Sequence, residues 1–299
     1  MRHRRGSPMS PGILVATASG LVLGGEVVAL EGRHVTALAR RSGGWLAVTD
    51  RSDVHSIGHD WVTDLLGTVS GVDAVAEFGG EPVVGTEGAR LFTVGDDPQP
   101  EAAFDAAPGR ADWYTPWGGP PTVRSMDAGP DGLRWVNIHV GGVLVGDGAG
   151  WQPTMDADND VHQVIAHPDR DAIALCAAAV GLGWTIDSGS TWSWSTEGLH
   201  SRYARAVAAA GDLVFISVSR GPSGQDAALY RGRLGEALEP CDGIGRHDEN
   251  IDSGWVAAGA GLVAAVVPDG TVYVTTDNGD TWDEAFAVDE PRWLAVVPG

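Results

Sequence analysis

Three arginines hold the same place in a short apolar run that the chain repeats seven times. The runs cover residues 34–39, 71–78, 122–128, 161–168, 203–211, 253–261 and 291–299. Two residues before the central Leu, Val or Met of each run stand, in order, Thr36, Asp73, Arg124, His162, Arg205, Gly254 and Arg292. A guanidinium presents a planar fork of N–H donors that suits two-point binding of a carboxylate or phosphate.

If the runs lie side by side, this column forms a site for an anion or another polar ligand. The candidate ligand-binding residues are Asp73, Arg124, His162, Arg205 and Arg292. The same pattern also fits a structural role, in which the arginines pair with Asp73 or with carboxylates in loops and fill a hydrated channel. The sequence leaves both interpretations open.

The spacing of the runs predicts the elements that position this column. The runs return after roughly 40 to 50 residues, which is close to the length of one blade of a β-propeller. A second apolar run follows in the complete units, for example 174–180 or 213–219, and then a third strand and a short fourth. Four short strands per unit, with Gly-rich turns and no long helical period, predict an all-β chain folded as a seven-bladed β-propeller.

One turn is written twice, as TIDSGSTWSW at 185–194 and as TTDNGDTWDE at 275–284. We expect each to join the third and fourth strands of a blade, with the Asp side chain accepting hydrogen bonds from the turn and the Gly at positive φ. The Thr adds a hydroxyl contact, and the Trp packs its ring under the hairpin. These structural residues are Asp187, Gly189, Thr191, Trp192, Asp277, Gly279, Thr281 and Trp282.

Both turns match the Asp-box pattern S/T-x-D-x-G-x-[ST]-W, and the chain resembles the Asp-box (BNR-repeat) propellers. That group includes sialidases, sortilin-type receptors and the photosystem II stability-factor family. The resemblance implies that these turns are structural devices away from the ligand face. Residues 145–151 carry an eroded version, which keeps Asp147 and Trp151.

The sialidase branch of that resemblance implies an arginine triad, a Tyr nucleophile with a Glu partner, and an Asp acid. The chain lacks the Arg-Ile-Pro type motif before the first box, and of its four tyrosines only Tyr203 falls near the column. No Tyr/Glu pair can be named from the sequence. Sialidase activity is therefore not favoured.

The two ends of the chain predict how the ring closes. The last run has no strands after it, whereas residues 12–31 contain strands but lack a first run. We expect the terminal strands to pair and complete one blade, which removes the edges of an open sheet. The predicted organisation is a flexible tail at 1–11 and a single propeller at 12–299, with an inserted loop at 108–122.

Composition narrows the partners. The formal charge is −21 and every basic residue other than histidine is an arginine, so nucleic acid and anionic membranes are poor partners. No stretch approaches the roughly 20 apolar residues that span a bilayer. Cys176 and Cys241 are too far apart to form a framework. We expect free thiols and a cytoplasmic location.

Two segments resemble metal sites only superficially. Residues 155–162 lack the Gly and the distal Glu of an EF-hand calcium loop. His55 and His59 would share one face of a helix, but they lie in a strand-rich context. We predict no metal and no cofactor.

The sequence thus favours a non-enzymatic binding or assembly protein, with a protein partner or a small anionic ligand at the mouth of the central channel. The alternative is a glycoside hydrolase or lyase that acts on an anionic sugar there. Since propellers support binding, assembly and catalysis, the fold does not choose between these functions.

Overall fold

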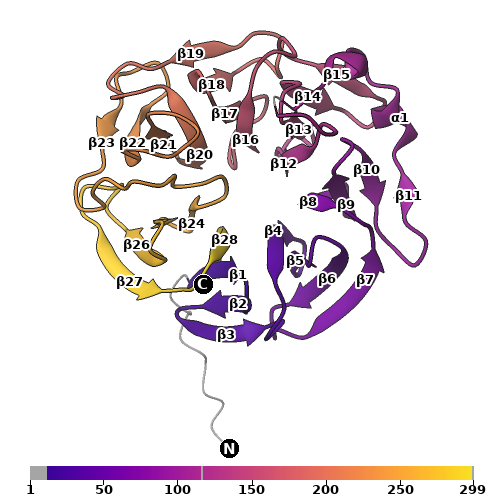
Figure 1. The fold of residues 1–299 in the computed structure, drawn as a ribbon, viewed down its shortest axis with the longest axis horizontal. Coiled ribbons are helices and arrows are strands. Elements are labelled where there is room, and N and C mark those ends of the chain that lie inside the picture. Colours follow the sequence, from indigo (N-terminus) through magenta and orange to yellow (C-terminus); the bar gives the residue numbers. More distant parts are fainter. Residues whose placement is uncertain (1–11, 116, 298–299) are drawn as a thin grey trace, which may run out of the picture.

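The chain forms a ring of seven antiparallel sheets with four strands each, a seven-bladed β-propeller (Figure 1). The computed structural model describes residues 12–115 and 117–297. The tail predicted for residues 1–11 lies outside this part. No helix in the described part is long and apolar enough to cross a membrane.

Within each blade the strands follow one another from the centre of the ring outward. Blade 1 contains β28 (Pro291–Val297), β1 (Gly12–Thr17), β2 (Gly20–Leu23) and β3 (Glu26–Ala29). Blade 2 contains β4 (Val35–Arg41), β5 (Gly44–Thr49), β6 (Asp53–Gly58) and β7 (Thr63–Thr68). Blade 3 contains β8 (Val72–Phe78), β9 (Glu81–Thr86), β10 (Leu91–Thr93) and β11 (Gln99–Pro100).

The other four blades repeat this order. Blade 4 contains β12 (Val123–Ala128), β13 (Arg134–Ile138), β14 (Val143–Gly146) and β15 (Trp151–Pro153). Blade 5 contains β16 (Val161–Ala166), β17 (Ala174–Ala178), β18 (Gly181–Thr185) and β19 (Ser193–Ser195). Blade 6 contains β20 (Tyr203–Ala210), β21 (Leu213–Ser219), β22 (Ala228–Arg233) and β23 (Glu239–Pro240). Blade 7 contains β24 (Val256–Gly259), β25 (Leu262–Val266), β26 (Thr271–Thr275) and β27 (Asp283–Ala287).

The seven runs recognised in the sequence are the seven innermost strands, as predicted. The second strand of each blade is almost continuously buried, because it faces neighbouring blades on both sides; β5, β17 and β25 have no exposed residue. The ring is therefore held together by apolar clusters between adjacent blades, and its centre is left to the inner strands.

The two ends of the chain close the ring, which confirms the predicted pairing. β28 pairs antiparallel with β1 from Gly12 opposite Val297 to Thr17 opposite Pro291. Leu14 and Val15 on β1 are fully buried, and Leu294 on β28 is nearly so. Blade 1 is thus built from both ends of the chain.

The two repeated turns have the same hydrogen bonds. Between β18 and β19, Asp187 accepts from the N–H of Thr191 at 2.8 Å and from its hydroxyl at 2.7 Å. Between β26 and β27, Asp277 accepts from the same groups of Thr281 at 3.0 and 2.6 Å. The glycine two residues after each aspartate has a φ of 84° or 88°, the left-handed region that favours glycine.

The tryptophans of these turns lie against the preceding blade. Trp192 meets Trp135 of blade 4 edge to face, with ring centroids 6.3 Å apart. Trp282 meets Phe215 of blade 6 in the same way at 6.1 Å. Both tryptophans are half-buried, whereas Trp135 and Phe215 are buried. The turns therefore fasten blade to blade.

The connection between β11 of blade 3 and β12 of blade 4 contains the inserted loop expected at 108–122. It holds two short helical turns, α1 (Ala102–Asp105) and η1 (Arg110–Asp112). Phe104 and Trp113 anchor it in the core, with ring centroids 5.6 Å apart. Trp117 of this loop is 73% exposed.

Candidate functional site

The predicted column coincides with a structural irregularity of the inner strands. Six of the seven inner strands have a register shift near their start, a β-bulge that leaves a residue without a partner in the sheet. The residues skipped by the pairing are Thr36, Asp73, Arg124, His162 and Arg292, and Arg205 together with Ala206. Gly254 is the exception, since it precedes β24.

A bulge turns one side chain out of the regular alternation of a strand, and such bulges are common beside functional sites. Hydrogen bonds between neighbouring inner strands fix their relative position. Val164 N–H donates to Ser125 Oγ of the preceding blade at 2.8 Å, and Val207 N–H donates to Gln163 Oε1 of the preceding blade at 3.2 Å. The bulged residues therefore lie at one end of the channel, called the start end here because the inner strands begin there. The opposite end is the finish end.

Two members of the column are engaged by neighbours of their own. Asp73 lies 2.7 Å from a guanidinium nitrogen of Arg51, in the turn after β5. Arg292 lies 3.0 Å from a carboxylate oxygen of Glu290, and its side chain is 40% exposed. These contacts fit the structural interpretation of the column, because each charge already has an opposite partner.

His162 is fully buried, contrary to its expected role as a contact residue at the mouth. Its Nδ1 donates to the carbonyl oxygen of Ala204, and its Nε2 lies 3.3 Å from Asp160 Oδ1. The ring also packs on Tyr203, with centroids 4.6 Å apart. His162 thus positions Tyr203 and Asp160.

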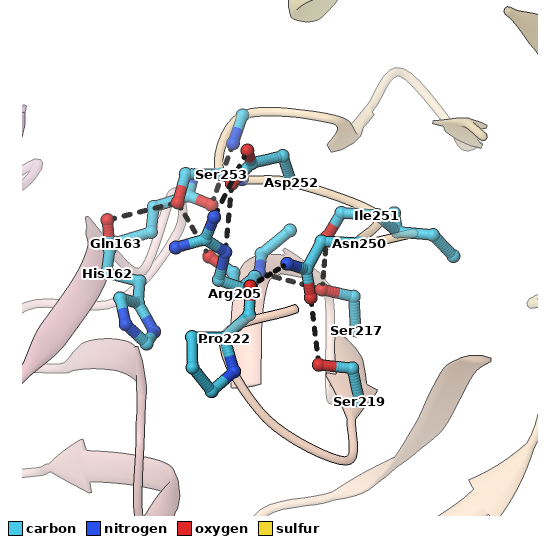
Figure 2. A network of polar contacts seen from close by, with 12 residues as sticks. His162, Gln163, Arg205, Ser217, Ser219, Pro222, Asn250, Ile251, Asp252 and Ser253 are labelled. Atoms are coloured by element: carbon cyan, nitrogen blue, oxygen red, sulfur yellow. Dashed lines mark hydrogen bonds and ion pairs between the residues drawn. The ribbon is translucent and has the colours of Figure 1, made fainter. Parts of the chain in front are cut away.

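Arg205 shares its charge with a loop carboxylate. Its Nε lies 3.1 Å from Asp252 Oδ1, and its guanidinium lies 5.9 Å from the centroid of the Tyr203 ring. Figure 2 shows this ion pair beside the polar network of blades 5 and 6.

Arg124 has no such partner. Within the described residues no carboxylate oxygen lies within 4.0 Å of its guanidinium, and its one polar contact is His139 Nδ1 at 3.4 Å. Arg40, Arg202 and Arg233 also lack a carboxylate, but they are exposed to water, whereas Arg124 is half-buried. Burial, and then repulsion from Arg205, lower the pKa of Arg124.

The histidine beside Arg124 is neutral at physiological pH. Burial and the Arg124 charge lower the pKa of His139 to about 4. Its Nδ1 accepts from Arg124, so its Nε2 carries the proton and faces Asp160 Oδ1 at 3.7 Å. Burial opposes ionisation of Asp160, but contacts with His162, His139 and Arg124 outweigh it and lower the pKa of Asp160.

The loop before β24 lies at the start end and reaches toward the centre of the ring in Figure 1. Ser253 Oγ donates to the carbonyl oxygens of Arg205 at 3.0 Å and His162 at 3.2 Å. Gly254 N–H, at the start of blade 7, donates to Gln163 Oε1 of blade 5 at 3.1 Å. Figure 2 shows this tether, which fixes the loop over blades 5 and 6.

Sequence reasoning missed His139, Asp160, Asp252 and the tether. The first three lie in or next to loops that carry no repeated pattern, so nothing in the sequence placed them near the column. An aromatic rim was also missed: Trp117 meets the His139 ring edge to face at 4.6 Å, and Tyr114 is 45% exposed. The inserted loop thus brings large exposed rings to the Arg124 side of the start end.

No protein-family model matches this sequence, and no curated protein sequence matches it. The structure is similar to a protein from Lactobacillus plantarum, with 14% identity over 97% of this chain and 100% of that one and a TM-score of 0.65. It is similar to the WD40 β-propeller domain of Doa1, with 15% identity over 93% and 86% and a TM-score of 0.62. The likeness shows the fold alone.

A third similar structure is an enzyme, the GH74 protein of Niastella koreensis. The identity is 14%, the TM-score is 0.57, and the match covers 89% of this chain but 44% of that one. The similar structures thus include both a WD40 domain and an enzyme. Function has to be argued from the residues of this chain.

Proposed function

We propose that this chain is a non-enzymatic binding protein, and that its ligand carries a carboxylate which Arg124 binds at the start end of the channel. The observation that carries the proposal is the state of Arg124. It is the arginine of the described residues that is shielded from water and still lacks a carboxylate within 4.0 Å. A shielded charge without a counter-ion is costly, and a bound carboxylate offsets that cost.

The surroundings favour a ligand with an apolar group next to its carboxylate. Arg124 contacts His139, and His139 carries the exposed Trp117 ring on its edge. Tyr114 adds a second exposed ring from the same inserted loop. Aromatic side chains at such a rim bury large apolar area on binding. A protein segment with an acidic or C-terminal carboxylate, or a small aromatic acid, has this chemistry.

The glycosidase alternative has weaker support. Tyr203 lies beside His162 and Arg205, as a nucleophile near an arginine site would. However, burial raises the pKa of Tyr203, and within the described residues no carboxylate hydrogen-bonds to its hydroxyl. A nucleophilic tyrosine needs a base or a lowered pKa. Binding without turnover is therefore the favoured function.

The repeat type and the location are parts of the same proposal. The matching hydrogen bonds of Asp187 and Asp277 support assignment to the Asp-box type of propeller. The turns lie between third and fourth strands, away from the bulged residues. Cys176 and Cys241 are buried free thiols, which is in keeping with a reducing, cytoplasmic location.

The proposal is tested by calorimetric titration with benzoate and with its neutral analogue benzamide. We expect wild-type protein to bind benzoate and not benzamide, and Arg124→Gln to weaken benzoate binding about tenfold or more. Arg233→Gln is the matched control, since Arg233 also lacks a carboxylate but is exposed; it should bind like wild type. Equal affinities for benzoate in wild type and Arg124→Gln would refute the site.

Screening against sialoside and uronoside substrates separates binding from catalysis. We expect no turnover. Hydrolysis or elimination that disappears in Arg124→Ala would overturn the non-enzymatic assignment in favour of the glycosidase or lyase.

A further inference from the structure

The channel itself is a cavity that the proposed function does not use. Its volume is about 690 Å³, and it extends from Ser125, Gln163 and Gly254 to Arg40, His59 and Pro168 near the finish end. Volumes of roughly 300 to 1,000 Å³ are typical of small-molecule sites. Arg40 and His59, which line the cavity near the finish end, are exposed to water, so a ligand can enter there.

The wall of this cavity has one charged residue in a layer of small apolar ones. Asp127 stands one residue after the aligned Met126 of β12. At the matching position the other six inner strands carry alanine five times and isoleucine once, and all of these side chains line the cavity. They are Ala39, Ala76, Ile165, Ala208, Ala257 and Ala295.

The Asp127 carboxylate has hydrogen bonds but no counter-ion. Its Oδ1 accepts from the N–H of Ala128 at 2.9 Å, and its Oδ2 accepts from the N–H of Ala166 at 3.0 Å. No cationic group of the described residues lies within 4.0 Å of it. Burial raises the pKa of Asp127 to about 6. At neutral pH it is therefore ionised and unneutralised inside the channel.

The other titratable groups of the cavity stand at its finish end. Arg41 pairs with Glu77 at 3.2 Å, so these two charges cancel. Arg40 is exposed at the rim, and His59 is exposed in the loop after β6. Strands β16, β20, β24 and β28 contribute no titratable side chain to the lining. Asp127 is thus the one titratable residue in its layer of the described channel wall.

We propose that the channel binds a small organic cation, an ammonium or amidinium group on an apolar body, with Asp127 as its counter-ion. The cation enters through the finish end, and its N–H groups donate hydrogen bonds to the free lone pairs of the Asp127 carboxylate. Its apolar body lies against the alanine layer and Ile165. The net charge of −21 favours the approach of a cation. This site does not involve Arg124.

The test compares benzylammonium with benzyl alcohol, which has the same ring but no charge, by calorimetry at millimolar concentration. We expect wild type to bind benzylammonium at one site and benzyl alcohol at least about tenfold more weakly. Asp127→Asn should lose that preference, and affinity for benzylammonium should fall as the pH drops below about 6, where Asp127 takes up a proton.

Two further variants keep the test decisive. Ala257→Phe narrows the cavity and leaves Asp127 in place, so it should abolish binding of both probes even if Asp127→Asn folds poorly. Asp64→Asn removes an exposed carboxylate on β7 and should change nothing. Binding that survives both Asp127→Asn and Ala257→Phe, or no preference for the cation in wild type, would overturn the proposal.

Discussion

The two ends of the channel differ in how their charged side chains are paired. At the start end, bulged residues and loops crowd together, and Asp73, Arg205 and Arg292 each have an opposite partner. Toward the finish end, a layer of alanines lines an open cavity, Arg41 pairs with Glu77, and Arg40 and His59 are exposed. Yet each end keeps one shielded charge that has no counter-ion within 4.0 Å among the described residues, Arg124 and Asp127 respectively. Both residues lie on β12 of blade 4.

This difference teaches how a repeat protein acquires sites. Six inner strands share the bulge, but the bulged side chains differ, and three of the bulged charges, Asp73, Arg205 and Arg292, form ion pairs with residues of neighbouring turns or loops. In blade 4, Arg124 instead contacts His139 in the turn after β13, and that imidazole is neutral. The candidate site thus lies in blade 4, the blade in which the bulged arginine has no carboxylate partner among the described residues.

The largest expected effect comes from breaking the ring on which both ends depend. Deletion of residues 291–299 removes β28, exposes the edge of β1 and uncovers the fully buried Leu14 and Val15. We expect the truncated protein to aggregate or to melt far below wild type. The measurement is thermal unfolding followed by circular dichroism, with a synthetic peptide of residues 291–299 added back as the control.

That peptide should restore part of the lost stability if β28 acts through strand pairing. Unchanged melting after the deletion would contradict closure of the ring by the two termini.

A smaller effect on stability sharpens the comparison at the finish end. The pKa of Asp127 is raised to about 6 in the folded protein, above its unfolded value. Its contribution to folding is therefore complete below the unfolded pKa and is lost as the pH rises through about 6. Between about pH 4 and pH 7 this loss amounts to roughly 1 to 3 kcal/mol.

Asp127→Asn should remove this pH dependence, so the variant should gain stability relative to wild type as the pH rises. Urea unfolding of both proteins at several pH values measures the difference. A constant difference across this range would show that Asp127 is not shielded from water, and the contrast between the two ends would lose one of its two charges.

The sequence could predict the frame of the molecule and which residues begin the inner strands. The inner strands, the closing blade and the turns at Asp187 and Asp277 follow from local patterns: apolar runs, turn chemistry and repeat length. The column of bulged residues followed from the same alignment, since a bulge shifts each strand at the same point. The same alignment places Asp127 among alanines, but the sequence analysis did not identify it.

The partners could not be predicted, because they depend on contacts between distant loops. Gln163 and Gly254 are 91 residues apart in sequence and meet through a single side-chain oxygen. His162 was expected at the mouth, yet packing under Tyr203 and the bond to Ala204 bury it completely. Whether a bulged residue faces solvent or protein is decided by the loops above it.

The most direct test of the central claim observes the Arg124 guanidinium itself. In protein labelled with ¹⁵N arginine, the Nε–H signal of Arg124 is assigned by its loss in Arg124→Lys and is then followed during titration with benzoate and benzamide. We predict that this signal shifts saturably with benzoate, stays in place with benzamide, and moves more than that of any other arginine. A benzoate shift confined to other arginines, or no saturable shift at all, would contradict the assignment of Arg124 as the carboxylate-binding residue.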